Sequence, residues 1–379
     1  MTHRLSDLVT REDIDRVTSP NGTLHRLPGV AFRSEEFLAL EFRRWLSRTW
    51  LFVGRGADIP NPGDGTTVPG LPVFLVRGRD GKIRAFLNAC RHRGHRILKE
   101  PCQAKRLFVC PYHSWSYDLE GRLVRTPHMA GADRHELEGL DKTDYGLKPV
   151  RCEQWHDWIF INLSGEAEPL KDFVAPIAER LSFVDFGRLK HFLTMSRRPI
   201  EANWKVCVEN TMEPYHLPFV HAKTAAGQPL DQHYSISEDP IFGSGIEVPG
   251  SVYTNEHGAG GLDNLDMSAH YLLRAPNFFL TSYAPDVIVD TMYVPDQRDP
   301  RKCWLEQAWY TTSGREVTAA EIAEWESLEE AVMIEDVTVM AEVQAGAETA
   351  VVDDGGVLSP VWETCIHGFY RHLIERLDD

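Results

Sequence analysis

The sequence lacks any apolar run near the ~20 residues that a membrane-spanning helix needs, so we expect no transmembrane segment. It also lacks an excess of basic residues, because 40 Lys and Arg stand against 56 Asp and Glu, for a formal net charge of −16. Nucleic-acid binding favours a basic face, so this balance argues against a nucleic-acid partner. The N-terminal stretch MTHRLSDLVTREDIDR is too polar for a secretory signal.

Cysteine is sparse and shows no disulfide framework. Seven cysteines, an odd number, are scattered through 379 residues. Such usage is typical of a reducing compartment, so we expect a cytoplasmic protein. There is also no internal repeat and no low-complexity segment. The 42% hydrophobic and 25% charged residues are typical of a soluble globular protein, and the length favours two domains.

Two of the cysteines are each paired with a histidine. Cys90 and His92 form C-x-H, and Cys110 and His113 form C-x-x-H seventeen residues later. Zinc is one candidate, although zinc sites commonly use C-x₂₋₄-C and H-x₃₋₅-H pairs. The mixed pairing favours a Rieske [2Fe–2S] centre, in which two cysteines hold one iron and two histidines hold the other. The alternative is that the four residues bind no metal and simply lie in turns of a β domain.

A second candidate metal site lies further along the chain, in NWKVCVENTMEPYHLPFVH. An Fe(II) that activates oxygen is held by two histidines and a carboxylate on one face. Glu213 and His216 are three apart and share a helix face, whereas His216 and His221 are five apart and would diverge. Pro214 and Pro218 predict that the helix ends or bends here, which would let both rings face one metal. The alternative is two surface histidines on an irregular segment.

The motifs NACRHRGHRI, CPYHSWSYDLEGRLVRTP and NWKVCVENTMEPYHLPFVH, in this order, resemble the large (α) subunit of Rieske non-haem iron oxygenases. This family comprises ring-hydroxylating dioxygenases and related monooxygenases and N-demethylases. The resemblance runs from about Trp50 to the C-terminus. One departure is Ser114, where the family usually has glycine. The implied fold is α+β: an N-terminal all-β Rieske domain, then an α+β catalytic domain with an antiparallel sheet and helices that carry a mononuclear iron.

We therefore expect three parts. Residues 1–48 form a helical segment that packs on the catalytic domain or on a neighbouring subunit, residues 49–165 form the Rieske domain, and residues 166–379 form the catalytic domain. Short β-rich runs separated by turn signals support the β domain, with a hairpin turn at Asp80-Gly81. In the catalytic domain, we expect a loop over 222–262, strands over 271–312, one or two helices over 317–346 and a helix over 362–377.

The resemblance also supplies the third iron ligand. EDVTVMAEVQAG matches the family's late Asp with a glutamine eight residues on, which assigns Asp336 beside His216 and His221. From the residues alone, Asp336 is one acid among several on a charged helix, and any of them could face solvent. The resemblance gives Glu213 another role, as a hydrogen-bonding bridge between His216 and His113 of a neighbouring subunit. It thereby implies a homotrimer, with a small β subunit as an additional component left open. The other acidic residues near Asp336 on this charged helix are Glu324, Glu326, Glu329, Glu330 and Glu335.

The function implied is that of a terminal oxygenase. Electrons from NAD(P)H would pass through a reductase or ferredoxin into the [2Fe–2S] cluster and on to the mononuclear Fe(II), which uses O₂ to hydroxylate, dihydroxylate or demethylate a small organic substrate. The glutamate in EN-x-x-E-x-Y-H resembles members that act on quaternary ammonium compounds or aromatic acids, and both substrate classes, with aromatic hydrocarbon catabolism, stay open. A Rieske electron-transfer protein is the alternative, although such a carrier would not need the histidine pair.

Overall fold

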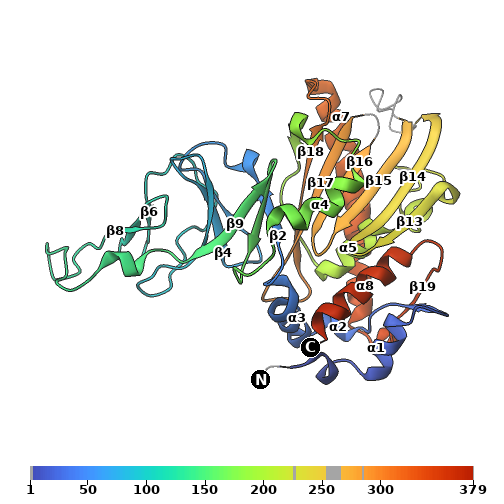
Figure 1. Ribbon diagram of the computed structural model, residues 1–379, viewed down its shortest axis with the longest axis horizontal. Helices are drawn as coiled ribbons and strands as arrows, with labels where there is room; N and C mark the ends of the chain where they lie inside the picture. The colour runs from blue at the N-terminus through green and yellow to red at the C-terminus, as the bar shows by residue number, and fades with distance from the viewer. Residues whose placement is uncertain (1–2, 225–227, 253–265, 284–285, 379) are drawn as a thin grey trace. The chain divides into compact units, whose positions relative to one another are not determined.

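The computed structural model describes residues 3–224, 228–252, 266–283 and 286–378, and the chain forms two compact units (Figure 1). Ser47–Leu170 form an all-β unit, and Met1–Leu46 join Lys171–Asp379 in an α+β unit. The order of an all-β unit followed by an α+β unit confirms the predicted fold class. No helix in the described part of the chain combines the length and apolarity that crossing a bilayer requires.

The all-β unit is built on a six-stranded antiparallel sheet. The β4–β5 hairpin turns at Gly81, whose φ of +78° suits a residue without a side chain. A second sheet of three short strands, β6, β7 and β8, follows in the chain. The six strands are, in sheet order, Leu51–Arg55 (β2), Trp158–Asn162 (β10), Pro149–Trp155 (β9), Ile83–Leu87 (β5), Val73–Arg77 (β4) and Gly65–Val68 (β3); the short ones are Phe108–Val109 (β6), Ser116–Tyr117 (β7) and Leu123–Arg125 (β8).

The α+β unit contains one antiparallel sheet whose seven-strand path runs β11-β18-β17-β16-β15-β14-β13, with β12 also paired to β18. Its central strands β16 and β17 are buried along most or all of their length, as expected for a sheet covered by other elements. The strands are Lys190–Thr194 (β11), Arg198–Ile200 (β12), His233–Glu238 (β13), Ile241–Val252 (β14), Asp266–Arg274 (β15), Phe278–Tyr283 (β16), Val287–Pro295 (β17) and Cys303–Thr311 (β18).

Helices cover this sheet and bring distant parts of the chain together. α5 packs against β14, β15 and β17 and against α7, while α8 packs on β13 and β14 (Figure 1). α7 is a single helix of 29 residues that starts in a capping box between Thr318 and Glu321. The helices are Arg11–Thr18 (α1), Val30–Arg33 (α2), Glu35–Glu41 (α3), Leu170–Arg180 (α4), Trp204–Met212 (α5), Leu217–Val220 (α6), Ala319–Ala347 (α7) and Thr364–Leu377 (α8); Leu24–His25 (β1) pairs with Val357–Leu358 (β19).

The predicted loop over 222–262 is wrong for much of its length, because β13 and β14 run through it. The glycines that suggested a loop have a packing role instead. A Cβ on Gly243 would lie 1.8 Å from the backbone oxygen of Tyr271 on β15, so only glycine lets the two strands approach this closely. The part of the prediction that concerns residues 253–265 lies outside the described residues.

A buried ion pair ties the N-terminal helices to α5. Nζ of Lys205 lies 2.7 Å from Oε1 of Glu41, and both side chains are 0% exposed. The indole N–H of Trp204 donates to the other Glu41 oxygen at 3.1 Å. Burial raises the pKa of Glu41 and lowers that of Lys205 against their mutual attraction, so each charge depends on the other. These contacts with Glu41 fix the first turn of α5 in the core of the α+β unit.

We predict that Lys205→Met destabilises the α+β unit by about 3–5 kcal/mol, because it leaves the Glu41 carboxylate buried without a counter-charge. Chemical denaturation followed by tryptophan fluorescence measures the loss. The double variant Glu41→Leu/Lys205→Met, which removes both charges, is the matched control and should recover most of the stability. A single variant as stable as the wild type would contradict this account of the pair.

Candidate metal centres and substrate cavity

The four residues of the predicted cluster set lie on two loops with the same backbone pattern, one after β5 and one after β6. In the first loop the N–H of Gly94 donates to the carbonyl of Cys90 at 2.8 Å, and in the second the N–H of Ser114 donates to the carbonyl of Cys110 at 2.9 Å. Two loops closed in the same way can each present one cysteine and one histidine.

The closing residue of each loop has a left-handed backbone. Gly94 has φ +74° and Ser114 has φ +56°. This conformation favours glycine, because a Cβ adds a steric cost of about 1–2 kcal/mol. It explains why the family pattern has glycine after the second cluster histidine, and it shows that this chain keeps the same turn with serine.

The two cysteines of the predicted cluster set are buried, whereas the two histidines are exposed. Cys90 and Cys110 are 4% and 2% exposed and belong to the apolar core of the all-β unit. His92 and His113 are exposed, with their ring centroids 4.7 Å apart. The sulfur end of the set is therefore shielded, and the imidazole end faces outward, as two histidines on an outer iron would require.

Two aromatic side chains support this arrangement. Trp115 stacks on His92 with ring centroids 4.9 Å apart and an interplanar angle of 13°, which orients the imidazole. The hydroxyl of Tyr117 lies 3.2 Å from Sγ of Cys90 and accepts the N–H of Arg91 at 3.0 Å. Burial raises the pKa of Tyr117, so its O–H stays protonated and can donate to a cysteine thiolate.

The second candidate site is built where α5 ends. The backbone of Glu213 is extended, and α5 stops at Met212, as Pro214 predicts. His216 immediately precedes the four-residue helix α6, and His221 immediately follows it. The break turns two rings that would diverge on a continuous helix toward one point.

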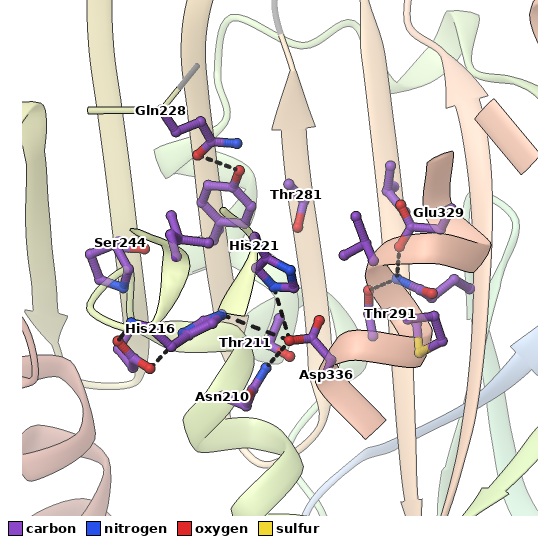
Figure 2. A pocket seen from close by; sticks show the side chains of 18 of the residues that line it. Asn210, Thr211, His216, His221, Gln228, Ser244, Thr281, Thr291, Glu329 and Asp336 are labelled. Atoms are coloured by element: carbon purple, nitrogen blue, oxygen red, sulfur yellow. Dashed lines mark hydrogen bonds and ion pairs between the residues drawn. The ribbon is translucent and has the colours of Figure 1, made fainter. Parts of the chain in front are cut away.

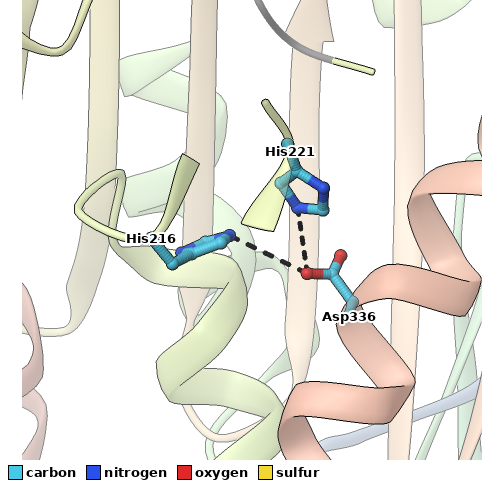
Figure 3. A group of neighbouring side chains, drawn as sticks. All are labelled: His216, His221 and Asp336. Carbon is cyan, nitrogen blue, oxygen red and sulfur yellow. Dashed lines mark ion pairs between the residues drawn. The ribbon is translucent and has the colours of Figure 1, made fainter. Parts of the chain in front are cut away.

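Asp336 on α7 completes this group (Figure 3). Its Oδ1 lies 3.0 Å from Nε2 of His221 and 3.8 Å from Nε2 of His216. One ligand atom from each of the three residues lies within 4.8 Å of the others, a spacing that suits a single metal ion. Two imidazoles and one carboxylate on one side of a point, with open space on the other, are the donors of a 2-His-1-carboxylate iron site.

Each histidine of this group is oriented by a glutamate. Nδ1 of His216 lies 2.6 Å from Oε1 of Glu213, and Nδ1 of His221 lies 2.8 Å from Oε2 of Glu335, which also accepts from the hydroxyl of Thr224 at 2.6 Å. With both Nδ1 atoms donating, both Nε2 atoms are left as metal ligands. The sequence analysis gave Glu335 no role among the acidic residues near Asp336. The sequence alone does not show which side of the helix faces His221.

Charges around His221 favour its protonated form. Burial lowers its pKa, but the hydrogen bonds and charges of Asp336 and Glu335 outweigh this and raise it to about 9. The same two carboxylates that attract a proton would attract a metal cation to Nε2. Asn210 donates from Nδ2 to Oδ1 of Asp336 at 2.9 Å, which fixes the carboxylate.

A glutamine ties α7, which carries Asp336, to α5, which ends shortly before His216. Oε1 of Gln344 accepts the N–H of Asn203 at 2.8 Å, and Nε2 of Gln344 donates to the carbonyl of Phe32. Asn203 is the N-cap of α5, and Gln344 lies eight residues after Asp336 on α7. The glutamine in the family pattern therefore fixes the position of α7 relative to α5.

The metal-ligand group opens into a cavity of about 140 Å³ (Figure 2). α7 lines one side of it with residues at helical spacing from Trp325 to Asp336. The sheet supplies three tyrosines on neighbouring or nearby strands, Tyr271, Tyr283 and Tyr293, and the strands missed in the sequence supply His233 and Ser244. The cavity thus joins an apolar and aromatic wall to the candidate iron site.

Among the aromatic residues on the strands expected over 271–312, Tyr283 lines the cavity. Phe278, Phe279 and Trp309 are 0% exposed and pack in the core, as is usual for aromatic residues on buried strands. Tyr271, Tyr293 and Trp325 were missed. Their strand or helix register, and hence the face they occupy, depends on tertiary pairing that a single sequence does not contain.

Two family models match the chain. The Rieske [2Fe-2S] domain matches residues 49–141, and the ring hydroxylating alpha subunit (catalytic domain) matches residues 186–379, just over half of the chain. The protein therefore belongs to the family of ring-hydroxylating α subunits, the large subunits of Rieske non-haem iron oxygenases, as its motifs predicted.

Individual relatives refine this class. Choline monooxygenase of Amaranthus tricolor is 27% identical over 359 residues, 93% of this chain and 77% of that protein. The glycine betaine monooxygenase oxygenase subunit of Chromohalobacter salexigens is 36% identical over 199 residues, 52% of this chain and 43% of that protein. The carnitine monooxygenase oxygenase subunit of Acinetobacter pittii is 30% identical over 214 residues, 55% of each chain. The last two alignments span about half of each relative.

Solved structures share the fold over nearly the whole chain. The quaternary ammonium Rieske monooxygenase CntA superposes with a TM-score of 0.79 at 23% identity, covering 96% of this chain and 98% of that one. Naphthalene 1,2-dioxygenase superposes with a TM-score of 0.76 at 21% identity, covering 94% and 92%. At these identities the likeness concerns the fold, which is common to oxygenases of different substrates.

The two matched domains imply a Rieske [2Fe–2S] cluster and a mononuclear iron, and the donor sets fit both. Buried sulfurs beside outward imidazoles suit the cluster, whereas a zinc finger would use separate Cys and His pairs. His216, His221 and Asp336 suit a single Fe(II) with open positions toward the cavity.

We predict that Asp336→Ala lowers the iron content from about three to about two atoms per chain while the visible absorption of the cluster persists, because only the lone iron loses a ligand. Iron analysis and absorption spectroscopy on the same sample measure both. Glu342→Ala, on the exposed side of α7, is the matched control and should retain all the iron. Full retention in Asp336→Ala would point to Glu335 or another acid as the ligand.

Proposed function

We propose that this chain is the terminal oxygenase of a Rieske system that oxidises a quaternary ammonium compound with O₂. The observation that carries the proposal is the group His216, His221 and Asp336 at the end of a cavity with an aromatic wall. Aromatic faces attract quaternary ammonium groups. The relatives described above are named for choline, glycine betaine and carnitine, which supports this substrate class over aromatic hydrocarbons.

The protein groups have separable roles in this proposal. When bound, the cluster supplies single electrons and the mononuclear iron activates O₂. Cys90, Cys110, His92 and His113 would hold the cluster, which would receive electrons from NAD(P)H through a reductase or ferredoxin. Glu213 accepts from Nδ1 of His216, so that Nε2 of this ring faces the iron position. The cavity wall orients the substrate and limits its access to water.

We also propose that electrons cross between subunits of a homotrimer. The exposed imidazoles of His92 and His113 leave the outer end of the cluster set free to meet a neighbour, where Glu213 of that neighbour could accept from His113. One solved structure of CntA is described as giving insight into inter-subunit electron transfer in that protein. A trimer that also contains small β subunits is the alternative assembly.

An electron-transfer protein that carries only the Rieske cluster is the competing function. The second donor set and its adjoining cavity argue against it, because a carrier needs neither. An aromatic substrate is the competing substrate class, supported by the shared fold with naphthalene 1,2-dioxygenase.

Oxygen uptake tests the proposed function directly. The purified protein, reduced through a reductase and NADH, should consume O₂ in proportion to an added quaternary ammonium compound, and mass spectrometry should detect its oxidised or demethylated product. Naphthalene and benzoate serve as aromatic comparisons. Turnover of the aromatic compounds alone would refute the substrate class, and reduction of the cluster without any oxygen uptake would favour the electron carrier.

We predict that Glu213→Gln retains both metals but lowers turnover by at least about 100-fold, because a neutral amide no longer stabilises two imidazole N–H groups at once. Steady-state oxygen uptake and iron content measure the two effects. Glu201→Gln, at a side chain that is 74% exposed, is the matched control. Wild-type turnover in Glu213→Gln would show that the electrons take another route.

A further inference from the structure

Three carboxylates line the described part of the cavity, and no Lys or Arg does. They belong to Glu213, Glu329 and Asp336. The residues outside the described ranges contain neither Lys nor Arg, and the proposed iron and His221 lie at the Asp336 end. Glu213 is engaged with His216, and Asp336 belongs to the metal-ligand group. Glu329 is the remaining carboxylate of the three, and the proposed function assigns it no role.

Glu329 and Asp336 occupy the same face of α7 at different depths (Figure 2). They are seven residues apart, which corresponds to about 10 Å along a helix axis. A small molecule that spanned these levels would have one end near Glu329 and the other near the metal-ligand group. The helix therefore sets the distance between a fixed negative charge and the position where oxidation would occur.

An aromatic wall adjoins Glu329. Trp325 lies one helical turn before it on α7, and its ring centroid is 6.0 Å from that of Tyr283. Tyr283 in turn meets Tyr271 edge to face at 5.9 Å. All three line the cavity. Aromatic faces and a carboxylate are the two groups that proteins use to bind an alkylated ammonium ion.

Hydrogen bonds hold Glu329 in place. Nε2 of Gln307 donates to its Oε1 at 3.0 Å and also reaches the hydroxyl of Thr291 at 3.3 Å. Arg198, whose charge acts on Glu329, forms its ion pair with Glu330 at 2.5 Å. The carboxylate is thus positioned by a neutral amide, and a cationic ligand would provide its counter-charge.

On the basis of the proposed function, we infer that the cavity selects a substrate with an ammonium group and no carboxylate, and that Glu329 is the residue that determines this specificity. A betaine, carnitine or an aromatic acid that reached from the metal-ligand group toward Glu329 would bring a second carboxylate near this one, and no Lys or Arg of the described residues lines the cavity to offset it, which disfavours binding. Choline and related amino alcohols carry the cation without that anion. Glu329 is a positioning residue here, since it contacts the charged end rather than the reacting carbon.

Binding by the cluster-containing protein, measured by calorimetry under argon at pH 8, tests the inference with three probes. Choline carries the cation, 3,3-dimethylbutan-1-ol is its neutral isostere, and glycine betaine adds the carboxylate. Wild-type protein should bind choline at least about tenfold more tightly than either of the others. Glu329→Gln should lower choline affinity about 10- to 100-fold and leave the neutral isostere within about twofold.

Glu326→Gln removes the same charge from the exposed side of α7 and is the matched control; it should bind choline as the wild type does. An unchanged cluster spectrum and thermal midpoint in Glu329→Gln show that the variant is folded. Equal or tighter binding of glycine betaine by the wild type, or undiminished choline affinity in Glu329→Gln, would overturn the inference while leaving the proposed function intact. Absence of binding and oxygen uptake with every quaternary ammonium compound would overturn both.

The affinity for choline should also depend on pH. Burial raises the pKa of Glu329 to about 7, although the hydrogen bond from Gln307 opposes the rise. Below pH 7 the group is protonated and offers no charge, so choline affinity should increase between pH 6 and pH 8, and the increase should vanish in Glu329→Gln. A pH-independent wild-type affinity would contradict the role of this carboxylate. The other charged or titratable groups that act on Glu329 are Asp336, His221 and Arg198, and its own charge acts on Tyr271.

Discussion

The candidate active site depends on one kind of contact, an imidazole N–H held by a carboxylate. Glu213 fixes His216 and Glu335 fixes His221, each through Nδ1, so that both Nε2 atoms converge near Asp336. Without these two hydrogen bonds, either ring could rotate or present its other nitrogen. The helix break at Pro214 provides the backbone path, and the glutamates select the ring orientation within it.

This contact needs two helices in fixed register, and the core provides it. Gln344 on α7 bonds the N-cap of α5, and the buried pair of Lys205 and Glu41 anchors the first turn of α5 to the N-terminal segment. Burying a polar group in this way lowers the stability of the fold unless each of its hydrogen-bond partners is in place. The same contacts that stabilise the unit therefore also position α5 and α7, which carry or adjoin the three candidate ligands.

The sequence predicted the parts of the site that follow from local spacing. The paired Cys and His residues and the helix end at Pro214 lie in short motifs whose chemistry can be read residue by residue, whereas Asp336 was assigned through the family resemblance. Glu335, Glu329 and the tyrosines of the sheet could not be found this way, because their direction depends on helix phase and strand register set by distant partners. β13 and β14 were missed because the glycines that allow close strand approach look like loop residues in isolation.

α7 carries both the carboxylate of the metal-ligand group and one wall of the cavity. A substitution that shifts this helix would disturb ligand geometry and molecular recognition together. The tyrosines on β15, β16 and β17 contact the cavity without belonging to the ligand set, so they can vary independently of it. Substitutions of these tyrosines would therefore reshape the cavity wall without moving Asp336, whereas a shift of α7 would move Glu329 and Asp336 together.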